Sequence, residues 1–194
     1  MNKIRFLLVG VGGQGTILAS NVLAELGIAL GYDTKKAEVH GMSQRGGSVV
    51  SHVSWAEKVF SPIIPDGEAD IMISFEKLEA IRFANGIRPG AMVLVNDYEI
   101  VPVTVSSGGG EYPSDDALKD AFAPLTDKVV YVKGVKIAEE LGNAKAANVV
   151  ILGALSKMLE HDAEPWLKVI EGRVPPKFIE LNRKAFQAGR DAVA

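Results

Sequence analysis

Cysteine is absent from this chain of 194 residues. Without a thiol, the chain has no disulfide framework, no thiolate nucleophile and no cysteine ligand for an iron–sulfur cluster or a structural zinc ion. Histidine is scarce: the three imidazoles are His40, His52 and His161, and none of them has the spacing H-E-x-x-H or a comparable one. We therefore expect no metal site in this chain, and any redox centre that it serves must lie on another chain.

A strong net charge and a long apolar run are also missing. The formal net charge is −3, which gives no basic field for nucleic acid or for an acidic membrane surface. No apolar run approaches the ~20 residues that span a bilayer, and the first residues lack the layout of a signal peptide. We expect a cytoplasmic protein that binds neither nucleic acid nor membrane. The hydrophobic fraction of 47% is sufficient for the core of one domain, residues 1–194.

A glycine-rich turn near the start of the chain is the most informative pattern present. An apolar run at 4–9 leads directly into Gly10 to Gly15, which has the spacing G-x-G-x-x-G, and an apolar helical pattern follows. A buried strand, a glycine turn and the start of a helix form a cradle for anions, because glycines let backbone N–H groups approach a phosphate. The candidate ligand-binding residues of this turn are Gly10, Gly12, Gly13, Gln14, Gly15 and Thr16.

Strand and helix patterns alternate along most of the chain. Strands are predicted at 3–9, 34–39, 48–55, 70–75, 91–96 and 128–132, and helices at 15–30, 76–84, 114–122 and 135–141, with a helical last third. Two further short strands are predicted, one at 59–64 that pairs with 48–55 as an inserted hairpin, and one at 100–105. The pattern predicts an α/β fold, three-layer and Rossmann-like, with a mostly parallel sheet and an inserted β-hairpin.

A second glycine-rich loop follows the predicted strand at 34–39. Arg45 in this loop offers a planar, permanently charged fork that suits a carboxylate or a phosphate. If the sheet is parallel, this loop leaves it at the same edge as the first glycine turn, and open α/β sheets bind ligands at that edge. The candidate ligand-binding residues of the second loop are Ser43, Gln44, Arg45, Gly46 and Gly47.

Several classes of ligand remain open for the first turn. Glu38 lies where a dehydrogenase of the NAD type places its ribose-binding acid, although the strand before it is short and polar. A P-loop is excluded, because Gly15 is followed by threonine where the motif requires lysine. An adenylating enzyme of the ubiquitin-activating type uses a similar turn but commonly brings a cysteine. A tight turn without a ligand is the remaining alternative.

Two features outside the glycine loops have more than one interpretation. The predicted hairpin at 48–64 carries Trp55, Val59, Phe60, Ile63 and Ile64, which suit either a protein interface or ordinary core packing. Asn148 interrupts an otherwise apolar helix face. It suits either the start of a helix or a contact with a loop backbone.

Taken together, the two loops resemble those of a known family. Gly10 to Gly15, followed about thirty residues later by Ser43 to Gly47, is similar to the gamma-type subunits of 2-oxoacid:ferredoxin oxidoreductases. The fuller run from Glu38 to Val53 is most similar to the small subunits of the indolepyruvate branch of that family. The resemblance covers the whole chain, and the chain length and the absence of cysteine agree with it.

The resemblance implies a shared enzymatic task. The family oxidatively decarboxylates a 2-oxoacid, here an arylpyruvate such as indolepyruvate, with transfer of the acyl group to coenzyme A and of electrons to ferredoxin. It implies a large alpha subunit that carries thiamine diphosphate, magnesium and the iron–sulfur clusters. This chain is then expected to support the active site without a catalytic residue of its own, with coenzyme A as the cofactor that its two loops could contact.

Overall fold

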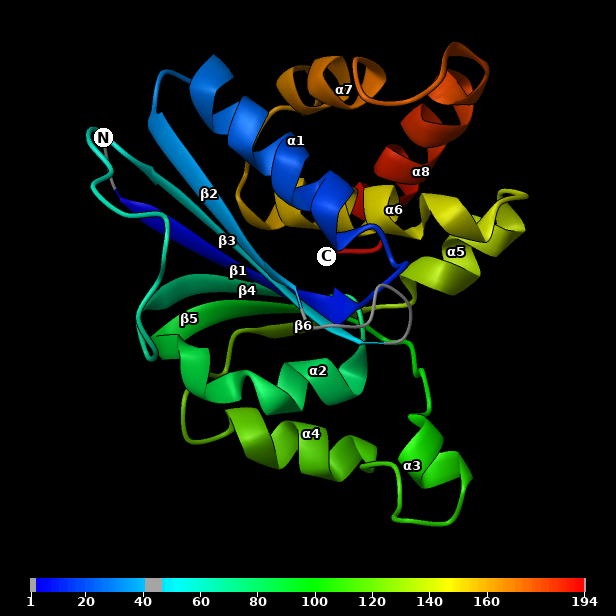
Figure 1. Cartoon of the computed structure of the whole chain (residues 1–194). Helices are drawn as coiled ribbons and strands as arrows, with labels where there is room; N and C mark the ends of the chain where they lie inside the picture. The colour runs from blue at the N-terminus through cyan, green and yellow to red at the C-terminus, as the bar shows by residue number, and fades with distance from the viewer. Residues whose placement is uncertain (1–2, 41–46, 194) are drawn as a thin grey trace.

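The computed structural model describes residues 3–40 and 47–193 and shows a sheet of six strands between two layers of helices (Figure 1). The strand order is β2-β3-β1-β4-β5-β6. Strands β1, β4, β5 and β6 are mutually parallel, whereas β3 runs antiparallel to both of its neighbours. The strands are β1 (Ile4–Val11), β2 (Asp33–His40), β3 (Ser48–Ala56), β4 (Ala69–Ser74), β5 (Ile87–Asn96) and β6 (Val129–Val132).

Helices cover the two faces of the sheet unequally (Figure 1). One face carries α1 (Thr16–Ala29), α5 (Gly134–Glu140), α6 (Ala147–Met158), α7 (Ala163–Glu171) and α8 (Ile179–Asp191). The other face carries α2 (Lys77–Arg82) and α4 (Asp115–Phe122), while the short α3 (Val103–Ser106) lies beyond the sheet. Each face has its own cluster of buried apolar side chains. The predicted three-layer α/β architecture with a mostly parallel sheet is therefore confirmed.

The antiparallel hairpin is formed by β2 and β3. Its ladder extends from Asp33 opposite Ala56 to His40 opposite Val49. The prediction of a strand at 59–64 was wrong, because β3 already has β2 on one side and β1 on the other. The backbone N–H of Val59 donates instead to Asp33 Oδ2 at 2.7 Å, and the connection to β4 has no regular structure.

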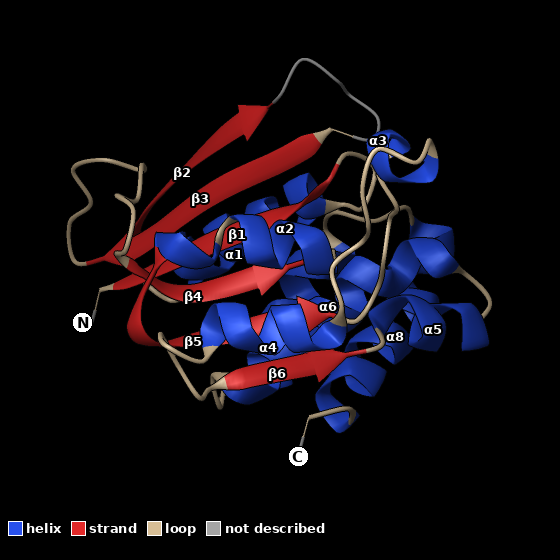
Figure 2. Cartoon of the chain, turned by 90° about the horizontal axis from the view of Figure 1, so that it is seen from below, coloured by secondary structure: helices blue, strands red, loops and turns tan. Residues whose placement is uncertain are grey.

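The predicted strand at 100–105 was also wrong. Residues 103–106 form α3, with Pro102 at its N-cap position. The strands β4 and β6 occupy the two sides of β5, so this segment cannot pair with the strand that it follows. The segment that leads into α3 instead lies beside the edge of the sheet at which the parallel strands end (Figure 2).

The first glycine turn and Gly47, the last residue of the second loop, lie at that same edge. The Gly12 N–H donates to the Gly47 carbonyl oxygen at 2.9 Å, which places the end of the second loop against the first turn. Ser43, Gln44, Arg45 and Gly46 lie outside the residues that the structure describes. Among the helices of residues 3–40 and 47–193, none combines the length and the apolarity required to cross a bilayer.

Candidate anion-binding site

The glycine turn between β1 and α1 depends on two left-handed residues. Gly13 has φ of 105° and Gly15 has φ of 85°, a region of backbone space that L side chains rarely adopt. At Gly15 a side chain is excluded for a second reason, because its Cβ would lie 2.1 Å from Asn148 Nδ2. The turn therefore allows the start of α1 to approach the start of α6 closely.

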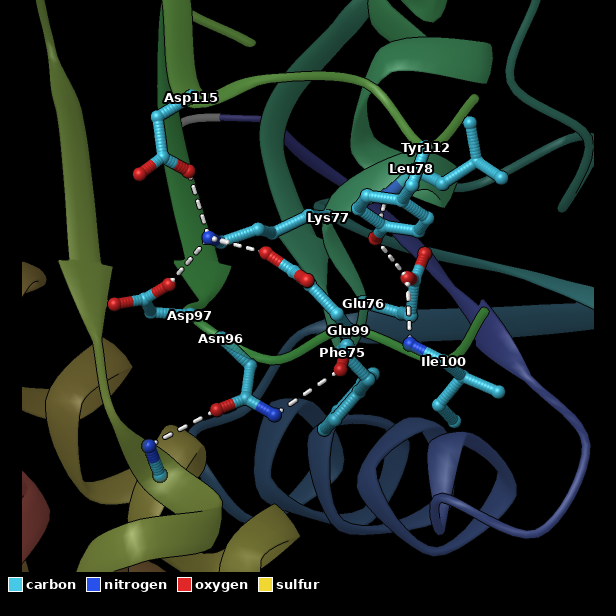
Figure 3. A network of polar contacts seen from close by, with 11 residues as sticks. Phe75, Glu76, Lys77, Leu78, Asn96, Asp97, Glu99, Ile100, Tyr112 and Asp115 are labelled. Carbon is cyan, nitrogen blue, oxygen red and sulfur yellow. Dashed lines mark hydrogen bonds and ion pairs between the residues drawn. The ribbon is translucent and has the colours of Figure 1, made fainter. Parts of the chain in front are cut away.

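Gln14 holds the turn in this shape. Its Oε1 accepts from the Val11 N–H at 2.7 Å, and its Nε2 donates to the Phe75 carbonyl at 2.8 Å. The Phe75 carbonyl also accepts from Asn96 Nδ2 at 3.0 Å, and Asn96 Oδ1 accepts from the Gly134 N–H at 2.9 Å (Figure 3). These amide groups connect the carboxyl ends of β1, β4 and β5 with the start of α5, so the floor of the site is preorganised.

A cavity of about 470 Å³ lies beside the turn, within the usual range for small-ligand sites. Tyr98 and Ile100 form one wall, and Lys145 and Asn148 form another. The residues that line it are Gly12, Gly13, Gln14, Gly15, Phe75, Asn96, Tyr98, Ile100, Val135, Ala144, Lys145, Ala147 and Asn148.

Two long helices begin at this cavity. Neither the N-cap of α1, Gly15, nor that of α6, Ala146, provides a side-chain hydrogen bond, and neither helix has an acidic residue in its first turn. Each N-terminus carries the equivalent of about half a positive charge. Lys145 precedes α6, is exposed, and has no carboxylate partner within the described part of the chain. The arrangement concentrates positive potential and suits an anion such as a phosphate.

Asn148 adds a buried polar side chain to the cavity lining. The residue is 6% exposed, and its Oδ1 has no hydrogen-bond partner among residues 3–40 and 47–193. An unsatisfied buried acceptor costs about 1–3 kcal/mol. Because Asn148 lines the cavity, this oxygen is available to a donor group of a ligand.

The predicted residues of the first turn separate into two sets. Gly12, Gly13, Gln14 and Gly15 line the cavity. Gly10 and Thr16 lie behind the turn, where a Cβ on Gly10 would be 3.0 Å from the side chains of Gln14, Phe75 and Thr16. The structure thus gives these two residues a packing position next to the turn.

Among the residues that line the cavity, sequence reasoning did not identify the three polar side chains of Asn96, Tyr98 and Lys145. It did single out Asn148 as a possible helix start, and the residue is indeed in the first turn of α6. Its place in the cavity follows only from the packing of α6 against α1.

The strand order weakens the NAD-type interpretation. Glu38 lies on β2, which is separated from β1 by β3, and adjacent strands are about 4.8 Å apart. Its Oε1 accepts from Lys36 Nζ at 2.6 Å. A ribose-binding acid would have to lie on the strand next to the glycine turn. In the described ranges, no group of three or more histidine, aspartate or glutamate side chains is arranged to hold a metal ion.

The fold and the site define a Rossmann-like α/β protein with a cavity that suits an anion at the carboxyl edge of its sheet. The chain belongs to the pyruvate ferredoxin/flavodoxin oxidoreductase family, whose profile matches residues 5–192. It is similar to the indolepyruvate oxidoreductase subunit IorB of Thermococcus kodakarensis, with 39% identity over 192 residues that cover 97% of this chain and 95% of that subunit.

Two solved structures share the fold. The gamma subunit of the keto/oxoacid ferredoxin oxidoreductase of Geobacter sulfurreducens has a TM-score of 0.71 and 24% identity, and the match covers 97% of each chain. The 2-oxoglutarate:ferredoxin oxidoreductase of Magnetococcus marinus has a TM-score of 0.75 and 18% identity, and the match covers 99% of this chain and 31% of that longer chain. These two structures show the shared fold, and the match to IorB over nearly its full length identifies the chain as a small subunit of the family.

Proposed function

We propose that this chain is the small subunit of an oxidoreductase that converts an arylpyruvate, such as indolepyruvate, to its acyl-coenzyme A derivative and passes electrons to ferredoxin. The IorB subunit of Thermococcus kodakarensis, which is 39% identical to this chain, is named for indolepyruvate, and this supports the substrate class. The chain lacks cysteine, so the iron–sulfur clusters belong to a larger partner subunit. That partner also holds thiamine diphosphate and magnesium, which supply the decarboxylation chemistry.

The role of this chain is to bind and orient coenzyme A. The observation that carries this proposal is the convergence of two helix N-termini, Lys145 and the unsatisfied Asn148 Oδ1 on one cavity. Coenzyme A contains a diphosphate and a phosphomonoester, and both suit such a cradle. The enzyme of Magnetococcus marinus is described with coenzyme A and succinyl-CoA bound, which is consistent with the family binding this ligand.

The test is the variant Lys145→Met, assayed in the complex with the large subunit. Removing this charge is expected to raise the KM for coenzyme A about tenfold, or about 1.4 kcal/mol, with kcat within about twofold. Lys157→Met is the matched control, because Lys145 lies just before the start of α6 whereas Lys157 lies near the C-terminal end of α6, away from the cavity.

Three results would contradict the proposal. One is an unchanged KM for coenzyme A in Lys145→Met when the complex assembles normally. Another is turnover of indolepyruvate by the isolated chain, assayed with coenzyme A and a viologen acceptor. The third is a large thermal stabilisation of the isolated chain by NADH, which would favour an autonomous dehydrogenase.

A further inference from the structure

The connection between β5 and α4, residues 97–114, forms the outer wall of the cavity through Tyr98 and Ile100. We call this connection the flap. Figure 3 shows that its two ends are fastened to the same pair of adjacent residues, Glu76 and Lys77, at the start of α2.

Lys77 holds both ends of the flap by its ammonium group. Its Nζ lies 2.8 Å from Asp97 Oδ1 and 3.1 Å from Glu99 Oε1, both in the first residues of the flap. The same atom lies 2.7 Å from Oδ1 of Asp115, which directly follows the last residue of the flap. The Lys77 backbone N–H also donates to the Tyr98 carbonyl at 3.1 Å.

Lys77 and Asp115 stabilise each other in their charged forms. Burial of Lys77, which is 8% exposed, favours its neutral form, but the hydrogen bonds that its ammonium group donates to Asp115, Asp97 and Glu99 outweigh burial and raise the pKa of Lys77 above its ordinary value. The hydrogen bond from Lys77 in turn lowers the pKa of Asp115. Lys77 and Asp115 therefore remain charged at physiological pH.

Glu76 holds both ends of the flap by its carboxylate. The residue is 1% exposed, and its Oε1 accepts from the Ile100 N–H at 3.1 Å and from the Tyr112 hydroxyl. The Tyr112 hydroxyl in turn accepts from the Leu78 N–H at 3.2 Å. The other carboxylate oxygen of Glu76 accepts from the Glu79 N–H at 2.9 Å and caps α2.

Apolar packing contributes little to the position of the flap. None of the residues 97–117 is buried, and Val101 and Val103 are 49% and 81% exposed. The flap also contains the glycine run 108–110, which adds conformational freedom. Its position therefore depends on the polar contacts of Glu76 and Lys77.

We propose that Glu76 and Lys77 are positioning residues that hold the flap closed, so that Tyr98 and Ile100 form the outer wall of the ligand cavity. The identity of the ligand rests on the proposed function, whereas the fastening of the flap does not. Releasing one end of the flap removes part of that wall and weakens ligand binding, while the reaction centre on the partner subunit is unaffected.

The test compares Asp115→Asn with Asp116→Asn in the assembled complex. Both residues lie in the first turn of α4, where a negative charge interacts favourably with the helix N-terminus, but Asp116 pairs with Lys119 at 3.0 Å and not with Lys77. In Asp115→Asn, amide hydrogen exchange at 98–114 should become about tenfold faster. The KM for coenzyme A should rise about threefold or more, with kcat within twofold, whereas Asp116→Asn should change neither quantity.

A second variant, Tyr112→Phe, keeps the ring and removes the contacts of its hydroxyl group with Glu76 and Leu78. It should accelerate exchange over the same residues. Equal exchange in the wild type, Asp115→Asn and Tyr112→Phe would overturn the proposal whatever the ligand is.

Coenzyme A kinetics separate the two proposals. Suppose that amide hydrogen exchange at 98–114 is faster in Asp115→Asn and that Lys145→Met raises the KM for coenzyme A. An unchanged KM in Asp115→Asn would then overturn the positioning role of Glu76 and Lys77. If neither Lys145→Met nor Asp115→Asn changes that KM, the assignment of coenzyme A fails, and the faster exchange alone supports the fastening of the flap.

Discussion

At the scale of single residues, Gln14 shows how a residue in a binding motif can serve the backbone. The glycine spacing predicted that Gln14 belongs to the ligand site, and it does line the cavity. However, both ends of its amide are engaged by Val11 and Phe75. Its role is to hold the turn in its observed conformation beside the cavity.

Replacing Gln14 by glutamate should therefore destabilise the protein. The carboxylate cannot donate to the Phe75 carbonyl, which would face a negative charge instead. We expect the free energy of unfolding to fall by about 1–3 kcal/mol, measured by urea denaturation. Gln187→Glu is the control, because Gln187 is an exposed residue of α8 whose amide contacts Asp191. Equal stability of the two variants would contradict this role of Gln14.

The aromatic and apolar residues of the segment 48–64 could not be assigned from sequence. Trp55 is fully buried, and its Nε1 donates to the Leu23 carbonyl at 3.0 Å, so it belongs to the core. Phe60 and Ile63 are 86% and 52% exposed. Sequence pattern cannot separate Trp55 from Phe60 and Ile63, because all three are large apolar side chains and their burial depends on contacts with distant segments such as α1.

At the scale of elements, the position of α6 depends on its contact with α8. A Cβ on Gly153 of α6 would lie 2.0 Å from the Phe186 carbonyl oxygen, and a Cβ on Gly189 of α8 would lie 1.9 Å from that of Val150. The two helix backbones are thus in direct contact through glycine. This contact holds the helix whose first turn contributes Asn148 to the cavity.

The variant Gly189→Ala tests this crossing. The added methyl group meets helix backbone that cannot move aside easily, so we expect a loss of about 3 kcal/mol or more of unfolding free energy. The control is Gly172→Ala, where the nearest atom to the new Cβ, the Val169 carbonyl oxygen, is 3.5 Å away. Its stability should stay within about 1 kcal/mol of the wild type. Chemical denaturation measures both, and similar losses would show that the crossing tolerates side chains.

Most elements could be predicted from the sequence because their periodicity agrees with their burial. The strand β1 is an apolar run that is buried on both faces, and the predicted helix at 15–30 matches α1 to within one residue at each end. The segments at 59–64 and 100–105 have strand-like composition, but whether they pair depends on which sheet edges are free. That information is a property of the whole sheet. The cavity walls made by Tyr98 and Lys145 were missed for the same reason, since distant segments bring them together.

At the scale of the whole molecule, two histidines connect stability to pH. His52 and His161 are partly buried on different parts of the fold, and burial lowers the pKa of each below its ordinary value of 6.5, while Asp66 and Asp162 oppose the shift. Near pH 6 the unfolded chain therefore binds more protons than the folded chain. The contribution of these two imidazoles to the free energy of unfolding is therefore full above about pH 6.5 and is lost as the pH falls below that value.

The double variant His52→Asn/His161→Gln should be less dependent on pH. We expect the wild type to lose unfolding free energy between pH 7.5 and pH 5.5, measured by urea denaturation, and the variant to lose less over the same interval. His40 is present in both proteins, so its contribution cancels in the comparison. The comparison of slopes is valid even if the variant is less stable at pH 7.5. Parallel pH profiles would show that these two imidazoles are not responsible.

The meeting of α1 and α6 at one cavity has a consequence for the subunit as a whole. The two helices come from the first and the last third of the chain, and with nothing between them their like-signed ends repel. An anion bound there would link the N-terminal ends of α1 and α6 by noncovalent contacts. By mass action it would also raise the melting temperature as its concentration rises. A subunit that is stabilised by its ligand would resist unfolding best in a cell where the concentration of that ligand is high.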